Sequence, residues 1–393
     1  MGKTLLLDWA RKEKTIKEEI NMKQFYPEVH KKLGFGCMRL PMSNEEVDTA
    51  QMKKMVDMFL ERGFNYFDTA HGYVGGKSET ALKECLTSRY PRERYILTDK
   101  LSTHHFNKEE EIRPLFESQL EACGVDYFDF YLMHAQDENI FAKFERCNAY
   151  KVAYGFKAEG KIRHFGISFH DRAEVLEKIL KAHPEIEVVQ IQFNYVDYED
   201  PSVESRKVYE VCEKYGKPVI VMEPIKGGSL LNLPDEAQKL YDELGGGSNA
   251  SYAIRFAAGF DNIMMVLSGM SNVENMEDNT SYMQEFQPLD RREMEAVEKV
   301  VEIFRAQNLI PCTACRYCME ECPKGISIPD LFALMNAKKR FGNWNTDYYY
   351  NNIHTGEGRK ASDCLRCGKC ERICPQHLNI RELLENVAAE FEA

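Results

Sequence analysis

Eight short apolar segments alternate with eight helical segments between residues 32 and 282, and this alternation limits the fold more than any other feature. The apolar segments have the length of β-strands and cover residues 32–40, 65–67, 95–100, 127–134, 163–169, 188–195, 218–223 and 263–268. In the segments between them apolar residues recur at helical spacing, over residues 46–62, 78–88, 108–123, 140–158, 172–182, 202–215, 250–258 and 273–282. Such an alternation predicts an α/β fold of parallel βαβ units closed into a (β/α)8 TIM barrel.

Polar side chains follow three consecutive predicted strands. Asp68 and Tyr73 follow the second strand, Lys100 ends the third, and His134 ends the fourth. Because the C-terminal ends of parallel strands converge on one mouth of a barrel, these four side chains are expected to meet there. Taken singly, each has an ordinary structural explanation, such as a helix cap for Asp68 or a hydrogen-bonded core histidine for His134. Their arrival in order favours a catalytic site.

Five motifs resemble those of the aldo-keto reductase superfamily. They are LGFGCMRLP from Leu33, NYFDTAHGYVGGKSE from Asn65, LTDKL from Leu97, YLMH from Tyr131 and HFGIS from His164, and together they span roughly residues 31–283. The resemblance implies an enzyme that reduces a small carbonyl compound, or oxidises the alcohol, by exchanging a hydride with a nicotinamide. It also implies catalytic roles for Asp68, Tyr73, Lys100 and His134.

Tyr73 is the expected proton donor to the carbonyl oxygen. A Lys100 ammonium about 4 Å away would favour the phenolate by about 4 kcal/mol at an effective dielectric of about 20, so the pKa of Tyr73 is expected to be lowered. Asp68 is expected to pair with Lys100 and hold it in place. His134 is expected to donate a hydrogen bond that orients the carbonyl.

The nicotinamide-binding positions implied by the resemblance match less completely. Ser168 and Gln190 match the pair that holds the carboxamide. Phe169 stands where the family has an Asn, and Met222 stands where it has a stacking aromatic residue. The other candidate positions are Cys37, Met38, Gly227, Gly228, Gly269, Asp278 and Asn279.

Several of these positions are expected to contact the pyrophosphate and the adenosine part of the dinucleotide. The turn of Gly227 and Gly228 could bring backbone N–H groups to a pyrophosphate, and Asp278-Asn279 match the acid–Asn pair near adenine. The positions whose cations grip a 2′-phosphate in NADP-using relatives are Gly269 and Asn275 here. Because Lys or Arg normally supplies that charge, NAD is favoured over NADP, with weak nicotinamide binding as the alternative.

Two cysteine runs near the C-terminus share the spacing C-x₂-C-x₂-C-x₃-C-P. They are Cys312, Cys315, Cys318 and Cys322 before Pro323, and Cys364, Cys367, Cys370 and Cys374 before Pro375. This is the bacterial ferredoxin spacing, in which the last cysteine of each run ligates the other [4Fe–4S] cluster. Cluster one is therefore expected on Cys312, Cys315, Cys318 and Cys374, and cluster two on Cys364, Cys367, Cys370 and Cys322. Zinc is the alternative for paired C-x₂-C, but it does not explain two identical runs closed by Cys-Pro.

The chain is expected to divide into an N-terminal extension (1–30) with one amphipathic helix, the barrel (31–287), a linking helix (288–310) and an α-rich ferredoxin-like dicluster domain (311–393). In the last of these, residues 328–335 are expected to form a short helix and residues 347–352 a Tyr-rich loop over the clusters. The direction of the chain predicts that the dicluster domain lies against the mouth of the barrel.

Composition restricts the compartment and the partners. A formal charge of −12 argues against nucleic acid or an anionic membrane surface as the main partner, and no apolar run approaches the roughly 20 residues of a membrane span. Of thirteen cysteines, eight lie in the two runs, and the scattered Cys37, Cys85, Cys123, Cys147 and Cys212 are expected to be buried thiols. A cytoplasmic location follows as an expectation.

Two functions from different classes remain open. The first is a carbonyl reductase that carries two [4Fe–4S] clusters, and the second is an electron-transfer protein whose barrel is a scaffold or docking module. A cluster passes one electron, whereas nicotinamide exchanges two together as hydride. Either a flavin bound near the ends of strands seven and eight bridges that mismatch, or the clusters are structural or redox-sensing, or a redox partner protein is the donor. No motif marks a flavin site.

Overall fold

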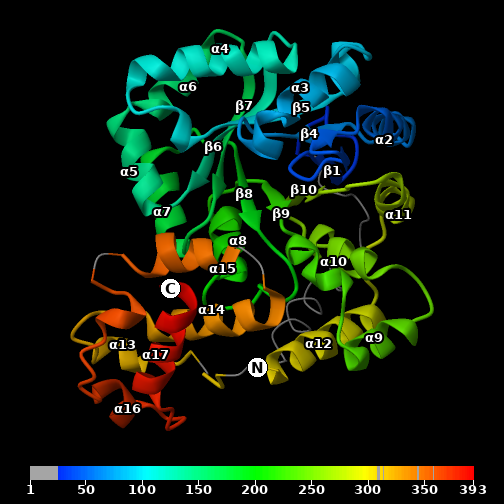
Figure 1. Ribbon diagram of the computed structural model, residues 1–393. Helices are drawn as coiled ribbons and strands as arrows, with labels where there is room; N and C mark the ends of the chain where they lie inside the picture. Colours follow the sequence, from blue (N-terminus) through cyan, green and yellow to red (C-terminus); the bar gives the residue numbers. More distant parts are fainter. Residues whose placement is uncertain (1–24, 308–309, 313, 343–344, 357) are drawn as a thin grey trace.

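The computed structural model describes residues 25–307, 310–312, 314–342, 345–356 and 358–393, so the helix expected in the N-terminal extension lies outside the described residues. Eight parallel strands close into a barrel in the order β1-β10-β9-β8-β7-β6-β5-β4 (Figure 1). They are β1 (Leu33–Gly36), β4 (Tyr66–Asp68), β5 (Ile96–Leu101), β6 (Phe128–Gln136), β7 (Ile162–Phe169), β8 (Val188–Gln192), β9 (Val219–Met222) and β10 (Ile263–Ser268). The predicted barrel is confirmed.

Helices surround the strands because each buries one apolar stripe against the barrel. In the barrel region they are α2 (Thr49–Glu61), α3 (Ser78–Leu82), α4 (Ile112–Cys123), α5 (Glu138–Arg146), α6 (Ala149–Ala158), α7 (Ala173–Ala182), α8 (Ser205–Lys214), α9 (Asp235–Asp242), α10 (Asn249–Ala258), α11 (Val273–Met283) and α12 (Arg291–Ala306). In α7, Val175, Leu176, Ile179 and Leu180 are buried at helical spacing. The five scattered cysteines are buried, as expected.

Two predicted helices differ from the structure, and one observed helix was not predicted. The helix expected from residue 46 begins at Thr49, because residues 42–47 form a hairpin of β2 (Met42–Ser43) and β3 (Glu46–Val47). Its turn residues Asn44 and Glu45 have φ of 50° and 65°, the positive pair that a tight type I′ turn requires. The single helix expected over 140–158 is divided into α5 and α6 by Asn148, whose φ is 52°. Helix α9 was not predicted.

The floor of the barrel is closed by residues that precede β1. Inside the strands, Tyr66, Phe130 and Met265 belong to one buried apolar cluster, and Phe25 and Tyr26 pack against it. The ring of Tyr26 lies 5.3 Å from that of Phe130. The opposite end, at which the strands terminate, therefore remains as the mouth.

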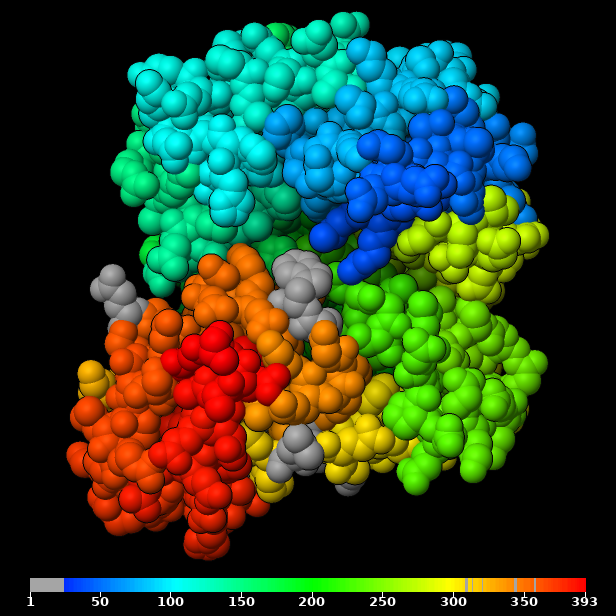
Figure 2. Space-filling model, in the orientation of Figure 1, coloured from blue at the N-terminus to red at the C-terminus, as the bar shows by residue number. Residues whose placement is uncertain are grey.

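The C-terminal domain lies against that mouth, as expected from the direction of the chain. Its helices are α13 (Tyr317–Glu320), α14 (Ile328–Phe341), α15 (Asn345–Tyr348), α16 (Lys369–Ile373) and α17 (Ile380–Phe391). Figure 2 shows this lobe, orange to red, next to the helices of the second half of the barrel, green to yellow. The Tyr348 hydroxyl donates to Asp137 at 3.2 Å, just after β6, and the Tyr349 hydroxyl donates to Gln192 at 3.4 Å, at the end of β8.

The expected Tyr-rich loop is wrong in its conformation, but its packing beside the cysteines is confirmed, since Tyr349 and Tyr350 share one buried apolar cluster with Cys318 and Cys370. Residues 345–354 are helical, as α15 followed by a π-helical turn, Tyr349–His354. Tyr348 and Tyr349 also reach the barrel, because their hydroxyl groups find acceptors at the strand ends. Helix α14 extends six residues beyond the predicted end at residue 335, to Phe341. No helix among the described residues combines the length and the apolar character that crossing a bilayer would require.

Candidate active site

The barrel brings the four predicted catalytic side chains together. Asp68 is the last residue of β4, Lys100 lies near the end of β5, and His134 lies near the end of β6. In the parallel register Asp68 pairs with Thr98, and Lys100 pairs with Leu132, so the three strands end at one level. Tyr73 follows β4 in a 3₁₀ turn that leads into α3.

Lys100 forms the buried centre of this group. Its Nζ donates to Asp68 Oδ1 at 2.7 Å and to the Thr69 carbonyl oxygen at 2.6 Å, and the side chain is fully buried. Gln190 Nε2 donates to the second Asp68 oxygen at 3.5 Å. Burial opposes the charge of Lys100, but Asp68 and Tyr73 outweigh it and raise the lysine pKa. Lys100 is thus a fixed cation with one face toward Tyr73.

Tyr73 lies over this cation but is not acidified by it. Lys100 Nζ is 4.7 Å from the centre of the Tyr73 ring, and the centres of the Tyr73 and His134 rings are 5.9 Å apart. Burial raises the pKa of Tyr73 by more than Lys100 lowers it, and Asp68 raises it further. The expected lowering of this pKa is therefore wrong, because the loss of water around the phenol outweighs the attraction of the cation. The phenol stays protonated at neutral pH.

His134 is held as a neutral imidazole. Burial, with Lys100 adding to it, lowers its pKa well below the usual value. Its Nδ1 lies 2.6 Å from the hydroxyl of Ser102, a buried residue that sequence reasoning missed. When Ser102 donates to Nδ1, the single imidazole proton is on Nε2, where it is available to a carbonyl oxygen.

The carboxamide positions lie beside the catalytic group. The Ser168 hydroxyl accepts from the Ala135 N–H at 2.7 Å, and Gln190 is bonded to Asp68. Both side chains are buried at the ends of β7 and β8. Met222 is the half-buried last residue of β9.

Some of the positions predicted to contact the dinucleotide beyond its nicotinamide are exposed, and others are buried or hydrogen-bonded within the fold. Met38 is 41% exposed, whereas the Cys37 side chain is buried in the core, its N–H donates to the Asp68 carbonyl oxygen and its carbonyl oxygen accepts from the Ser78 hydroxyl. Gly227 and Gly228 have φ of 66° and 100° and form an open turn after β9. Asp278 accepts a hydrogen bond from the Ser248 hydroxyl at 2.7 Å, and the Asn279 amide donates one to the Ser268 hydroxyl at 2.7 Å.

Arg39 is a second residue that sequence reasoning missed. It follows β1 and lies across Gly269, where a Cβ built on the glycine would meet the Arg39 side chain at 3.4 Å. Its guanidinium also lies 3.7 Å from Glu223 and borders Gly227. The prediction considered only the loop after the last strand, whereas this cation follows the first strand, β1, which pairs with β10 when the barrel closes. The LGFGCMRLP motif contains Arg39 and was the available signal.

Two small cavities in the C-terminal domain group the clustered cysteines. One is lined by Cys312, Cys315, Cys318 and Cys374, and the other by Cys322, Cys364, Cys367 and Cys370. Each therefore offers four thiols, three from one run and the last from the other, as the ferredoxin spacing predicts. The donors fit [4Fe–4S] clusters, which would supply one-electron redox chemistry.

An eight-stranded parallel barrel with this polar group at its mouth, followed by crossed cysteine runs, defines an oxidoreductase-type barrel joined to an iron–sulfur domain. The family model described as the Aldo/keto reductase family matches residues 32–302, and the model described as a 4Fe-4S dicluster domain matches residues 311–378. The chain belongs to the aldo/keto reductase family and carries a 4Fe-4S dicluster domain.

Individual relatives agree with this assignment. The chain is 27% identical over 195 residues to the NADH-specific methylglyoxal reductase of Escherichia coli (strain K12), covering 44% of this chain and 57% of that enzyme. It is 25% identical over 292 residues to the L-galactose dehydrogenase of Arabidopsis thaliana, covering 69% and 90% of the two chains. The structure of an aldo-keto reductase from Klebsiella pneumoniae in complex with NADPH covers 70% of this chain and 95% of its own, with a TM-score of 0.55 and 17% identity. The chain thus spans little more than half of the E. coli relative, and the structural likeness concerns the fold.

Proposed function

We propose that the barrel catalyses the nicotinamide-dependent reduction of a small carbonyl compound, or the reverse oxidation, with Tyr73 as the proton donor. The observation that carries the proposal is the packing of Tyr73 and His134 against the buried Lys100–Asp68 pair. A protonated phenol with a neutral imidazole beside it offers a proton and a hydrogen-bond donor to one carbonyl oxygen. The nicotinamide, when bound, supplies the hydride.

Each of the other residues has a role toward that oxygen. Lys100 stabilises the phenolate left after proton transfer, since its ammonium is fixed 4.7 Å from the ring centre. Asp68 positions Lys100 and compensates its buried charge. His134 orients the carbonyl through Nε2, while Ser102 fixes its other nitrogen.

We assign the nicotinamide to NADH in preference to NADPH. Gly269 and Asn275 bring no charge to the position of a 2′-phosphate. Arg39, which borders Gly227 and Gly269, is proposed to bind the pyrophosphate. The E. coli relative described as an NADH-specific methylglyoxal reductase is consistent with this choice and suggests small aldehydes as the first substrates to test.

The C-terminal domain is proposed to complete the substrate pocket as well as to carry clusters. Tyr348 packs on His170 with ring centres 5.6 Å apart, and burial, with Lys100 adding to it, lowers the pKa of His170 to about 4. His170 therefore lies within the field of the catalytic lysine, and Tyr348 borders the same side of the mouth. A small substrate would then meet both domains.

The test is anaerobic NADH oxidation with small aldehydes by protein that retains its clusters. Tyr73→Phe is expected to lower the rate of carbonyl reduction by roughly 10²- to 10⁴-fold, the usual contribution of a positioned acid, while NADH binding persists. Tyr317→Phe, at an exposed position beside Cys318, is the matched control and should keep the wild-type rate. An active Tyr73→Phe variant would remove Tyr73 from the role of donor.

The second candidate is an electron-transfer protein in which the barrel serves as a docking module. The eight cysteines grouped around two cavities favour it. It predicts that no aldehyde or ketone oxidises bound NADH, and that cluster reduction and reoxidation proceed equally in wild type and Tyr73→Phe.

A further inference from the structure

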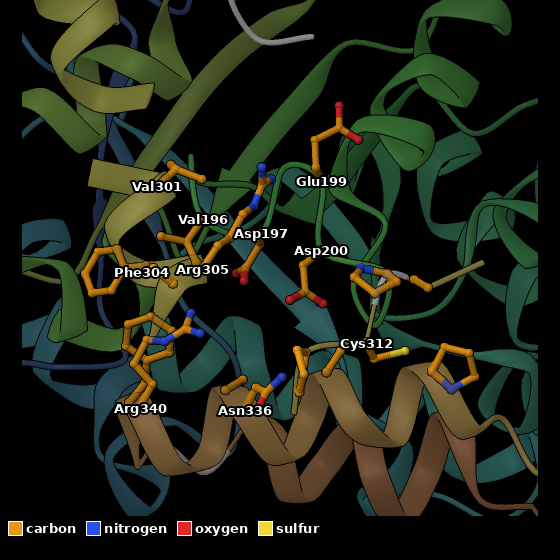
Figure 3. A pocket seen from close by; sticks show the side chains of 18 of the residues that line it. Val196, Asp197, Glu199, Asp200, Val301, Phe304, Arg305, Cys312, Asn336 and Arg340 are labelled. Atoms are coloured by element: carbon orange, nitrogen blue, oxygen red, sulfur yellow. The ribbon is translucent and has the colours of Figure 1, made fainter. Parts of the chain in front are cut away.

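A cavity of about 610 Å³ lies between the barrel and the C-terminal domain (Figure 3). Its barrel wall consists of residues 196–201, which follow β8, together with Lys226 and the end of α12. Figure 3 shows Asp197 and Asp200 on this wall, and Asn336 and Arg340 on α14 opposite. Its lining residues do not include Tyr73, Lys100 or the other catalytic candidates. The volume is in the range of small-molecule sites.

Arg340 has two nitrogen atoms that no described residue pairs with. Its Nε and Nη2 are shielded from water and have no hydrogen-bond partner among the residues that the structure describes. The guanidinium packs on the rings of Phe304 and Phe341, at 5.8 and 5.2 Å from their centres. Burial lowers the pKa of Arg340, Asp200 and Asp197 oppose this effect, and Arg305 adds to it. Among the described residues three cations line the cavity, and Arg305 and Arg340 are the two besides Lys226, which is paired with Asp197. A pair of arginines of this kind favours an anionic ligand.

The carboxylates of the cavity already bind other groups. Asp197 accepts from Lys226 at 2.5 Å. Glu199 is paired with Arg206 at 2.7 Å. Asp200 accepts from the backbone and hydroxyl of Ser202, at 2.8 and 2.5 Å. None of these three carboxylates is hydrogen-bonded to Arg340, so within the described part of the chain its Nε and Nη2 are left for a ligand.

The other lining residues indicate what kind of molecule would carry the anionic group. Phe304, Phe341, Val196 and Val301 are aromatic or aliphatic, and alanines and prolines cover much of the rest. At another side Cys312 lines this cavity and also the first cysteine cavity. A bound aromatic molecule would therefore lie against a ligand of cluster one.

We propose that this cavity binds a flavin mononucleotide, with its phosphate toward Arg340 and Arg305 and its ring system between the apolar walls near Cys312. Among aromatic mononucleotides, flavins are the class that exchanges electrons either singly or as a pair. That property suits a position between an iron–sulfur cluster and a nicotinamide enzyme. The proposal is independent of the role assigned to Tyr73.

The test is equilibrium dialysis of the anaerobically purified, cluster-containing protein against flavin mononucleotide. Bound flavin is released with acid and quantified by fluorescence, with saturating NADH present to fill the dinucleotide site of the barrel. One flavin per chain is expected. Riboflavin, which lacks the phosphate, should bind at least tenfold more weakly. Arg340→Ala should weaken binding at least tenfold, and Arg340→Lys should weaken it less.

Arg291→Ala, an exposed arginine on α12, is the matched control and should leave flavin binding unchanged. Iron content and NADH binding report whether each variant is folded. The proposal is overturned if no flavin binds, if NADH displaces it, if riboflavin binds equally well, or if folded Arg340→Ala binds flavin like the wild type.

Discussion

The two halves of the barrel mouth are built differently. Around β4, β5 and β6, buried charged and polar groups are bonded at 2.6–2.7 Å, as in Lys100–Asp68 and Ser102–His134. Between the ends of β9, β10 and β1, at the positions proposed to meet the dinucleotide, the ion pair is Arg39–Glu223 at 3.7 Å, and the Arg39 side chain is 39% exposed, although the deeper Lys226–Asp197 pair is buried and close at 2.5 Å. The half proposed for acid–base chemistry is thus tightly bonded, whereas the outer part of the half proposed for the dinucleotide presents open loops.

This difference fits the roles proposed for the two halves. A buried ion pair is stable only when its geometry is good and its remaining polar atoms are bonded, so the Lys100–Asp68 pair depends on Thr69 and Gln190. A dinucleotide supplies its own phosphates and hydrogen-bond partners on binding. The glycines at 227 and 228 leave room for it because they carry no side chain.

The largest effect is expected when the buried Lys100–Asp68 ion pair is removed. Lys100→Met leaves Asp68 buried without its cation and should lower the free energy of unfolding by about 3–5 kcal/mol. Carbonyl reduction should fall by 10²-fold or more, because the phenolate loses its stabilising charge. Chemical denaturation and anaerobic kinetics measure the two losses.

Lys100→Met combined with Asp68→Asn is the control. It removes the uncompensated charge and should recover most of the stability without recovering the rate. Equal stability of Lys100→Met and wild type would show that the pair is not buried as described.

His170, which follows β7, is expected to make the free energy of unfolding depend on pH. Its pKa is lowered to about 4 by burial and by Lys100. Above pH 6.5 the imidazole is neutral in both states; as the pH falls from 6.5 toward 4, the unfolded chain binds a proton that the native state does not, so stability is lost. At pH 5 this amounts to about 2 kcal/mol. The difference in unfolding free energy between wild type and His170→Asn, followed from pH 7 to 5, should change by that amount; a constant difference would contradict the assignment.

Arg39 tests the open half and should matter less. Arg39→Ala is expected to weaken NADH binding about tenfold, or about 1.4 kcal/mol, by removing one charge-assisted contact to the pyrophosphate. NADPH binding should weaken by the same factor, and the rate at saturating NADH should not change. A loss confined to NADPH would instead place Arg39 at the 2′-phosphate and would argue against NADH as the preferred cofactor.

The smallest effect concerns the pH dependence of the rate. Because burial raises the pKa of Tyr73 despite Lys100, the donor stays protonated through pH 9, and the rate of reduction should change less than twofold between pH 7 and 9. Reverse oxidation, which needs the phenolate, should rise with pH over the same range. A fall in reduction below pH 9 that Lys100→Met moves upward would show that the lysine outweighs burial.

Sequence patterns predicted that the candidate catalytic side chains lie together, because strand order fixes their position. Asp68, Lys100 and His134 end neighbouring parallel strands, and closure of the barrel leaves them no other place to converge. The crossed grouping of the cysteines is likewise a matter of spacing. Both predictions rest on the order and spacing of residues in the sequence.

Features that depend on the closed fold were not accessible in this way. Arg39 reaches Gly269 only because β1 pairs with β10. Tyr348 and Tyr349 find acceptors only once the dicluster domain lies on the mouth. The expected acidity of Tyr73 failed for a related reason, since a pairwise charge could be estimated from sequence but the burial that opposes it could not.

Hydride transfer at the mouth of the barrel is tested most directly with NADH that carries deuterium at the reactive C4 position. Under anaerobic conditions, wild-type protein and a small aldehyde should give an alcohol whose carbinol carbon holds one deuterium per NADH oxidised, and Tyr73→Phe should give almost none. An alcohol whose carbinol hydrogen comes from solvent, formed equally by both proteins, would mean that electrons pass through the clusters instead and would contradict the role of the barrel proposed here.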